Sequence, residues 1–383
     1  MKILFLISSM GGGGAERVAA LLANSWTRRG DDVTLMTTFS ERGECVYRLD
    51  EGVQLEFLSD HCEANTGRVQ RLRTMRRFIR RSRPDVIVSF LTNVNVAALL
   101  AGMGLGIPVI ASERTYPPLE TPSLPLFYRV MRRLTYPTAT ALVAQTVQTA
   151  DWMRQLAPKV RIATIPNPII VPLPVSEPSV EPADVAGPDD RIILWAGRLD
   201  GPKRPEIIVE AFARLAPEMP DWKLALTGSG PRFDEMKQLV AALRLEDRIL
   251  LPGFVGNLGS WYERADIYVM TTSFEGFPNS MLEALAHGRA SIAFDVLTGL
   301  RELSDSGRRL RLLPDQDHVN ALTEALRGLM SSRVSRDRLT AAARDVTEVY
   351  SERAICAMWD DLFAACLGSR PSAEPEFRTG RAE

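Results

Sequence analysis

The sequence predicts an α/β protein with two domains, each built on a parallel sheet, and three observations support this prediction. Short apolar runs of strand length alternate with stretches that repeat apolar residues at helical spacing. This alternation stops at a proline-rich stretch near the middle of the chain and starts again after it. The chain has 383 residues, which is long enough for two domains of ordinary size.

The first half opens with a buried strand, Lys2 to Ile7, followed by a glycine loop and a helix. A glycine loop between a strand and a helix can hold a phosphate at the helix N-terminus. The four glycines at 11–14 do not match the dinucleotide fingerprint, because its third position falls on Glu16 or Arg17. The second strand, Val33 to Thr38, also lacks a terminal acidic residue that would hold a ribose. The loop therefore does not favour a dehydrogenase.

Charge is distributed unevenly along the chain. Residues 1–170 carry 21 Lys and Arg against 14 Asp and Glu, so their net charge is +7, and the remaining residues carry −8. Residues 68–83 contain eight arginines and an apolar stripe at helical spacing. Two interpretations stay open, a surface helix with a solvated basic face and a helix that docks on anionic lipid headgroups. The second uses Arg68, Arg71, Arg76, Arg77 and Arg80. No aromatic platform accompanies them, so nucleic acid is not expected as a partner.

A strand from Pro108 to Ser112 leads directly into Glu113 and Arg114. Ligands bind beyond the carboxyl ends of strands in open α/β sheets, so both side chains are candidates. Arg114 could contact a phosphate or form a structural salt bridge. Later, residues 171–190 contain five prolines and show no apolar period, which is typical of an interdomain linker.

The second half restarts with a strand, Arg191 to Ala196, whose following loop contains Arg198 and Lys203. A bidentate guanidinium and a compact ammonium suit a diphosphate, although they could also be two surface cations beside a turn. Further turns follow later strands in the same half. These turns contain Gly228, Gly230, Phe254 and Val255.

A pair of glutamates brackets the next turn. The apolar run Ala265 to Met270 predicts a strand, and a helix is expected to begin near Asn279 or Ser280. Glu275 lies on the loop and Glu283 about one turn into the helix. Two carboxylates could accept hydrogen bonds from the paired hydroxyls of a sugar or ribose. Alternatively, Glu283 only favours the helix dipole and Glu275 is a loop charge.

Several of these motifs resemble those of family 4 glycosyltransferases. Glu-Gly-Phe-Pro-Asn279 with the following Leu-Glu-Ala-Leu-Ala-His-Gly288 resembles the family's Glu-x7-Glu signature. Gly197-Arg-Leu and Lys203 match its Gly-Arg-Leu-x-x-x-Lys pattern, and Gly-Gly-Ala-Glu-Arg17 resembles the start of many members. Ser112-Glu-Arg resembles the same segment of bacterial exopolysaccharide and lipopolysaccharide members. Many other members of the family have at this position a His that faces the donor sugar.

The resemblance implies the GT-B fold, with two facing Rossmann-like domains, parallel sheets and an interdomain cleft. Residues 1–170 would form the N-terminal acceptor-side domain and residues 191–350 the C-terminal nucleotide-sugar domain, joined by the linker at 171–190. Residues 351–367 would form a helix that crosses back to the N-terminal domain. Residues 368–383 have the composition of a disordered tail.

The implied activity is transfer of a hexose or N-acetylhexosamine from a nucleotide-diphosphate sugar, with a UDP-sugar favoured, to a glycan or polyprenyl-diphosphate-linked glycan. Transfer would retain configuration and serve cell-surface polysaccharide biosynthesis. The implied catalytic residues are Arg198, Lys203 and Glu275. The implied donor-binding residues are Gly13, Gly14, Gly228, Gly230, Phe254, Val255, Gly276, Phe277 and Glu283. Glu113 and Arg114 would lie on the acceptor side.

Neither a cofactor nor a metal is expected. Asp315-Gln-Asp317 fits a metal-binding pattern of the other major glycosyltransferase fold, but Asp317 is more simply a helix N-cap. Two other functions stay open, a nucleotide-sugar epimerase of the same fold and a non-catalytic protein that binds nucleotide sugars or membranes.

The sequence also bears on location. The four cysteines are scattered, which suits a reducing compartment. The N-terminus lacks the longer apolar region of a signal peptide, and no transmembrane helix is expected. We therefore expect a cytoplasmic protein that is peripheral at the inner face of the cytoplasmic membrane.

Overall fold

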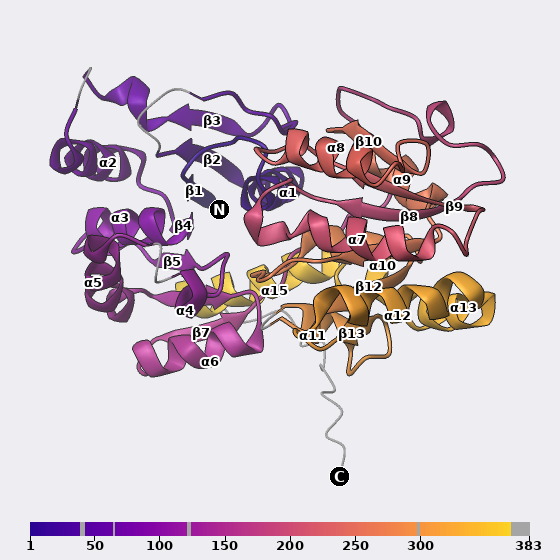
Figure 1. Cartoon of the computed structure of the whole chain (residues 1–383). Helices are drawn as coiled ribbons and strands as arrows, with labels where there is room; N and C mark the ends of the chain where they lie inside the picture. The colour runs from indigo at the N-terminus through magenta and orange to yellow at the C-terminus, as the bar shows by residue number, and fades with distance from the viewer. Residues whose placement is uncertain (39–42, 64–65, 121–123, 297–298, 369–383) are drawn as a thin grey trace, which may run out of the picture. The chain divides into compact units, whose positions relative to one another are not determined.

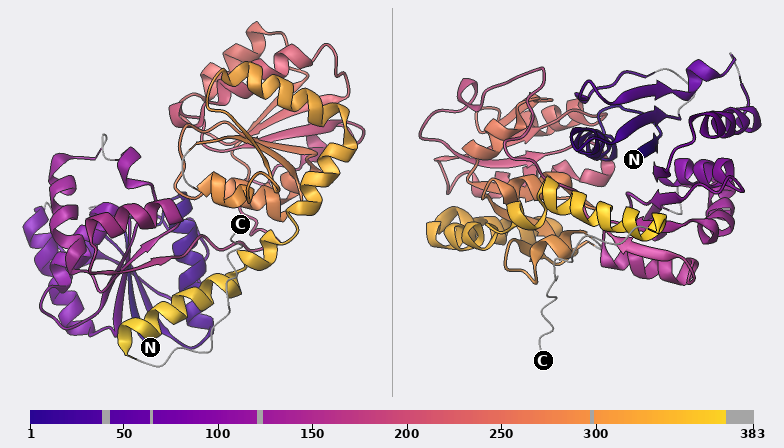
Figure 2. Two further views of the ribbon diagram at one scale, coloured as in Figure 1. Left: turned by 90° about the horizontal axis from the view of Figure 1, so that it is seen from below. Right: turned by 180° about the vertical axis from the view of Figure 1, so that it is seen from behind.

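The computed structural model describes residues 1–38, 43–63, 66–120, 124–296 and 299–368. The chain forms two compact units, of which the first contains Met1–Pro168 and the chain from Glu352 onward, and the second contains Ile169–Ser351 (Figure 1). Each unit is built on a parallel sheet with helices on both faces, as the sequence predicts (Figure 2). Apart from Gly368, the predicted disordered tail lies outside the described residues.

The first unit has a seven-stranded sheet in the order β3-β2-β1-β4-β5-β6-β7, and its neighbouring strands are parallel. Its inner strands are continuous apolar runs because both faces are covered. The strands are β1 (Lys2–Ile7), β2 (Asp32–Thr37), β3 (Gln54–Phe57), β4 (Val86–Phe90), β5 (Val109–Ser112), β6 (Ala141–Ala144) and β7 (Arg161–Thr164).

Helices cover the two faces of this sheet separately. Alternate residues of β1, namely Ile3, Phe5 and Ile7, pack with α1 (Gly14–Arg28) and α15 (Glu352–Leu367). Leu4 and Leu6 pack on the other face with the helices α2 (Arg68–Ser82), α3 (Thr92–Gly102) and α6 (Val147–Leu156). The remaining short elements of this unit are η1 (Leu58–His61), α4 (Pro117–Glu120), α5 (Leu126–Thr135) and η2 (Tyr136–Thr138).

The last helix, α15, belongs to the first unit although it follows the whole of the second. Its Trp359 and Phe363 rings lie 5.7 and 5.3 Å from the ring of Trp26 on α1. At its first turn, Arg28 donates to Glu352 at 2.7 Å. The aromatic contacts bury large side chains and hold α15 against α1.

The second unit has a six-stranded parallel sheet in the order β10-β9-β8-β11-β12-β13. Its strands are β8 (Arg191–Ala196), β9 (Trp222–Thr227), β10 (Ile249–Gly253), β11 (Ile267–Met270), β12 (Ala290–Phe294) and β13 (Arg311–Leu313). Its helices are α7 (Pro205–Leu215), α8 (Phe233–Ala242), α9 (Leu258–Arg264), α10 (Asn279–Ala286), α11 (Gly299–Ser304), α12 (His318–Ser331), α13 (Arg333–Ala342) and α14 (Val346–Val349). Two 3₁₀ turns complete it, η3 (Pro182–Asp184) and η4 (Gly201–Lys203).

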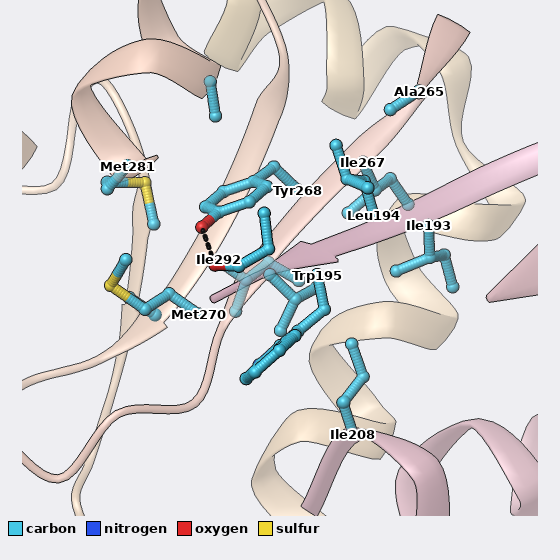
Figure 3. Close-up of a cluster of buried hydrophobic side chains, with 14 of the residues drawn as sticks. Ile193, Leu194, Trp195, Ile208, Ala265, Ile267, Tyr268, Met270, Met281 and Ile292 are labelled. Atoms are coloured by element: carbon cyan, nitrogen blue, oxygen red, sulfur yellow. Dashed lines mark hydrogen bonds between the residues drawn. The ribbon is translucent and has the colours of Figure 1, made fainter. Parts of the chain in front are cut away.

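Strands β8 and β11 lie side by side in the buried core of the second unit. Figure 3 shows Ile193, Leu194 and Trp195 of β8 beside Ile267 and Tyr268 of β11. The Tyr268 hydroxyl donates to the backbone carbonyl of Ala196 at 3.4 Å, at the end of β8. These buried contacts fix the carboxyl ends of β8 and β11 next to each other.

The proline-rich stretch at 171–190, interpreted above as a linker, lies in the second unit and is hydrogen bonded to it. Ser176 N donates to Gly256 O at 3.0 Å, and Val180 N donates to the Asn257 side-chain oxygen at 3.0 Å. Trp261 Nε1 donates to the carbonyl of Val180 at 2.8 Å. These bonds hold much of the stretch on the second unit.

Across the part of the chain that the structure describes, no helix is both long and apolar enough to cross a membrane.

Candidate active site

Two loops form the candidate site, both within the second unit. The β8 loop (residues 197–204) follows β8, and the β11 loop (residues 271–278) follows β11. The two strands are parallel neighbours, with Ile267 paired to Ile193 and Tyr268 to Leu194. Their loops therefore emerge at the same edge of the sheet, where open α/β sheets bind ligands.

Hydrogen bonds join the two loops directly. Thr271 Oγ1 donates to the carbonyl of Lys203 at 2.7 Å. The guanidinium of Arg204 donates in return to the carbonyls of Thr271 at 2.8 Å and Thr272 at 2.7 Å. Arg204 has a left-handed backbone with φ of 47°, which turns the chain from η4 into α7. The loops therefore hold each other's backbone in place.

The three predicted catalytic side chains lie on these loops. Lys203 Nζ and Glu275 Oε1 form an ion pair whose side chains are 29% and 16% exposed. Arg198 is 71% exposed, and its Nε lies 3.6 Å from Asp200 Oδ2. Asp200 also accepts from the backbone N–H of Lys203 at 3.3 Å. The site thus presents two cations, Arg198 and Lys203, each beside a carboxylate.

Glycines of the turn after β9 support the β8 loop from behind. A Cβ on Gly228 would lie 1.9 Å from the carbonyl oxygen of Gly197, and one on Gly230 would lie 2.3 Å from that of Leu199. Gly197 N and Leu199 N donate into the same turn, at 3.1 and 2.9 Å. Close backbone approach therefore requires glycine at 228 and 230. Their predicted contact with the donor stays a prediction.

The β11 loop is supported in the same way from α11. Gly299 N donates to the carbonyl of Gly276 at 3.3 Å, and a Cβ on Gly299 would lie 2.7 Å from Pro278 Cδ. The Phe277 ring is 5% exposed and lies 5.7 Å from that of Tyr350. Helix α10 then begins at Asn279, as the sequence predicts. The predicted donor contacts of Gly276 and Phe277 would come from their backbone N–H groups.

Glu283 is an interior residue of α10, only 1% exposed. Its Oε2 accepts from the Tyr262 hydroxyl at 3.1 Å. The Tyr262 ring stacks on His287 at 5.3 Å, and His287 Nδ1 lies 2.8 Å from the carbonyl of Glu283. Burial lowers the pKa of His287, so the neutral ring donates through Nδ1. The carboxylate of Glu283 is therefore held by a rigid aromatic support.

The other predicted donor residues lie in two places. Phe254 follows β10 and is 51% exposed, whereas Val255 is buried. Gly13 and Gly14 lie in the first unit, at the start of α1, and the Tyr47 hydroxyl donates to the carbonyl of Gly13 at 2.8 Å. Gly13 N also donates to the carbonyl of Gly11 at 3.0 Å, so this glycine loop is a tight turn.

Glu113, predicted on the acceptor side, is buried inside the first unit at 1% exposure. Its carboxylate accepts from Thr92 Oγ1 at 2.9 Å and from the Tyr136 hydroxyl. Arg132 Nη1 lies 4.0 Å away and is also buried. Any effect of Glu113 on an acceptor would therefore pass through these partners rather than through direct contact.

Arg114 is 8% exposed, with its guanidinium 4.0 Å from the centre of the Phe90 ring. Its Nη2 donates to Asn167 Oδ1 at 2.5 Å, and Gln145 Nε2 donates to the same oxygen at 2.5 Å. Burial lowers the pKa of Arg114 to about 9. The contacts of Arg114 are thus with an aromatic ring and an amide oxygen rather than the carboxylate of a salt bridge, and its contact with a phosphate stays a prediction.

The Asp315 and Asp317 carboxylates are engaged by protein groups. Asp317 occupies the N-cap of α12, as predicted, but its carboxylate accepts from the Asn320 side chain at 2.8 Å instead of from the helix backbone. Asp315 accepts from His318 at 2.7 Å and from Arg204 at 3.2 Å. Burial would raise the pKa of Asp315, but these two hydrogen bonds lower it below its usual value.

Sequence reasoning missed Arg204, Asp200 and Thr271, which position the loops. The sequence does contain one signal, because Pro205 marks the first residue of a helix and so places Arg204 at its N-cap. The left-handed backbone of Arg204 has no such signal, because the residue there is not glycine.

Two family models match the chain, one for each unit. The model described as "Glycosyl transferase 4-like domain" matches residues 13–168, and the model described as "Glycosyl transferases group 1" matches residues 190–332.

Relatives match over almost the whole chain. The chain is 25% identical to a Campylobacter jejuni α-1,4-N-acetyl-D-galactosaminyltransferase named for GalNAc-α-(1→4)-GalNAc-α-(1→3)-diNAcBac-PP-undecaprenol, covering 95% of this chain and 98% of that protein. It is 24% identical to the amylovoran biosynthesis glycosyltransferase AmsD of Erwinia amylovora, covering 94% and 99%.

Solved structures share the fold. Anabaena HepE in complex with UDP matches with a TM-score of 0.79 at 17% identity, covering 95% of this chain and 100% of that one. Sucrose-phosphate synthase of Thermosynechococcus elongatus matches with a TM-score of 0.80 at 19% identity, covering 96% and 100%. These matches confirm the resemblance found in the motifs. The chain belongs to the group 1 glycosyltransferases that have a glycosyltransferase 4-like N-terminal domain, and it has the GT-B fold.

Proposed function

We propose that this glycosyltransferase moves a hexose or N-acetylhexosamine from a UDP-sugar to a lipid-linked glycan during bacterial polysaccharide assembly, with retention of configuration. The observation that carries the proposal is the joined pair of loops, which places Lys203 against Glu275 and Arg198 on the same edge of the sheet. Relatives named for undecaprenol-linked glycans and for amylovoran support the acceptor class. The structural neighbour that contains UDP supports the nucleotide.

The cations would bind the donor diphosphate. Lys203 is paired with Glu275 across the two loops. A diphosphate arriving between Arg198 and Lys203 would replace the carboxylate as the partner of Lys203, and Glu275 would then accept from sugar hydroxyls. The same two cations would stabilise the extra negative charge that the diphosphate gains as it leaves. This arrangement needs no metal, and we expect transfer in the presence of a chelator.

The N-terminus of α10 would position the sugar. Gly276 and Phe277 lie just before a helix of eight residues, and the N-terminus of a helix attracts oxygen acceptors. Glu283, held by Tyr262, would accept from the ribose hydroxyls. The transfer itself breaks the bond between the anomeric carbon and the leaving phosphate oxygen and forms a bond from that carbon to the acceptor oxygen. The acceptor proton passes to the leaving phosphate, so nucleoside diphosphate and glycoside are the products.

Thermal unfolding in the presence of UDP, GDP, ADP and NAD, all without added metal, tests the donor class. A ligand that binds only the native state raises the midpoint. We expect UDP to raise it and the other three to have little effect. UDP-sugars would then be incubated with a polyprenyl-diphosphate-linked glycan in a chelating buffer, and the product would be analysed for linkage and configuration. A rise with GDP alone would replace the UDP assignment, and a rise with NAD alone would contradict the donor site.

A further inference from the structure

Helix α5 of the first unit presents four of its apolar residues to solvent, which reverses the usual arrangement. Leu126, Phe127, Val130 and Leu134 are 69, 51, 47 and 63% exposed. Arg132 of the same helix is turned inward and is 4% exposed. A surface helix of a globular domain normally buries its apolar stripe and exposes its charges.

The buried network around Glu113 sets this orientation. The Arg132 guanidinium lies 5.0 Å from the centre of the Trp152 ring and within 4.0 Å of Glu113. Tyr136, which directly follows the helix, is fully buried and donates its hydroxyl to Glu113. Rotating α5 to bury its apolar residues would pull Arg132 out of these contacts. The outward apolar face is therefore a fixed feature of the fold.

The four exposed apolar residues form one stripe. At 3.6 residues per turn, positions 126, 127, 130 and 134 fall within an arc of about 100°. Contiguous exposed apolar surface of this kind marks a binding site more often than single exposed residues do. We call Leu126, Phe127, Val130 and Leu134 the α5 stripe.

The layer formed by α2, α3 and α5 carries positive charge alone. Helix α3 packs against α5 on one side and α2 on the other, and the three form one layer of the first unit (Figure 1). Their sequences contain seven arginines in α2, three in α5, and no Asp or Glu in any of the three helices. Arg68, Arg73, Arg77, Arg80, Arg81 and Arg133 of this layer are exposed.

We propose that the α5 stripe is an apolar anchor that docks the first unit on an anionic phospholipid bilayer, with the arginines of α2 and α5 contacting the headgroups. Leucine, phenylalanine and arginine together are typical of helices that lie in a membrane interface, and the absence of Asp and Glu from α2, α3 and α5 complements an anionic surface. The inference rests on the proposed function, since a lipid-linked acceptor would bring the enzyme to a membrane. It differs from the sequence interpretation, which used only the arginines of α2.

Vesicle flotation with the full chain tests this proposal. We expect wild-type protein to float with vesicles of phosphatidylcholine and phosphatidylglycerol at 70:30, and to float less with phosphatidylcholine alone. The double variant Phe127→Ser/Leu134→Ser should lose about tenfold in partitioning for each side chain removed. Val334→Ser is the matched control, because Val334 is 79% exposed on α13 of the second unit, and its partitioning should equal that of the wild type.

Three results would overturn the proposal. They are equal flotation of wild type and double variant, no flotation of the wild type, and concentration-dependent self-association of wild-type protein that the double variant abolishes while flotation is unchanged. The thermal shift with UDP is recorded on the same samples and reports on the donor site separately. A wild-type protein that floats but shows no nucleotide shift would contradict the proposed function and support the α5 anchor.

Discussion

The two units place charged residues at equivalent ends of their sheets and use them in opposite ways. After β8 in the second unit, Arg198 and Lys203 keep 71 and 29% of their side-chain surface exposed. After β5 in the first unit, Glu113 and Arg114 are 1 and 8% exposed and have partners from their own unit. The topology that brings charges to a sheet edge therefore does not decide whether they face a ligand.

The surrounding residues account for this difference. In the second unit, Gly228 and Gly230 allow the turn after β9 to pack directly against the backbone of the β8 loop. The charged side chains of that loop remain at least partly exposed to solvent. In the first unit, Thr92 and Tyr136 come from α3 and η2, and both cover Glu113. A carboxylate that is buried must be hydrogen bonded, so these partners make it part of the core.

Glu113→Ala should produce the largest effect, a loss of stability in the first unit. Removing one partner of a buried ionic contact leaves the other uncompensated and costs about 3–5 kcal/mol. Chemical unfolding would be followed by the fluorescence of tryptophan, of which Trp26, Trp152 and Trp359 lie in the first unit. Because a chain with two units can unfold in two steps, the transition of the first unit should move alone.

Two variants keep this experiment interpretable. Glu113→Gln retains the shape and an acceptor for Thr92 and Tyr136, so we expect a smaller loss than for Glu113→Ala. Glu51→Ala removes an exposed carboxylate from the same unit and should change stability by less than about 0.5 kcal/mol. Wild-type stability of Glu113→Ala, together with a raised acceptor KM, would make Glu113 a ligand residue and remove the contrast between the units.

Lys203→Ala should mainly affect catalysis. Loss of one group that stabilises the leaving diphosphate lowers turnover on the order of 10²- to 10³-fold. Its ion pair with Glu275 is partly exposed, so we expect the unfolding free energy to change by no more than about 1 kcal/mol. Initial rates at saturating donor and acceptor give turnover, and chemical unfolding gives stability.

Lys237→Ala is the matched control, because Lys237 is an exposed lysine of α8 in the same unit. Its turnover should match that of the wild type. Near-wild-type turnover of Lys203→Ala would contradict the diphosphate assignment, and a large loss of stability would place Lys203 with the structural charges of the first unit.

The sequence predicts the sheets of both units more closely than it predicts the site. Its strands Lys2 to Ile7 and Arg191 to Ala196 coincide with β1 and β8, because a strand buried on both faces is a continuous apolar run. The start of α10 at Asn279 follows from the same strand, turn and helix pattern. These features follow from the local pattern of apolar residues and turns, so they can be predicted from a single sequence.

Side-chain orientation was not predictable in the same way. Glu113 is buried because Thr92 and Tyr136, 21 and 23 positions away, meet it in space. The apolar stripe of helix α5 faces solvent because Arg132 is held inside, although such a stripe normally faces the core. Both depend on tertiary contacts that helical or strand periodicity does not contain.

Glu283→Gln tests most directly whether burial separates structural carboxylates from ligand-binding ones, although its expected effect is the smallest of the three. Glu283 is as buried as Glu113, at 1% exposure, yet it lies on the helix that the site is built around. If it binds the ribose, replacing a charged acceptor with a neutral one weakens a charge-assisted hydrogen bond by about 1.5–3 kcal/mol. Since about 1.4 kcal/mol is tenfold, the donor KM should rise by about ten- to a hundredfold.

The structure separates this outcome from a structural role. Gln at 283 keeps an oxygen that can accept from the Tyr262 hydroxyl, so stability should change little, and Tyr262→Phe removes that hydroxyl while leaving the carboxylate. If Glu283 binds donor, the Gln variant raises the donor KM more than Tyr262→Phe does, and the exposed Glu210→Gln on α7 has no effect. If Glu283 only supports α10, the Gln variant leaves the donor KM unchanged. In that case the buried carboxylates Glu113 and Glu283 would both be structural, and only the exposed charged residues at the sheet edge would contact the ligand.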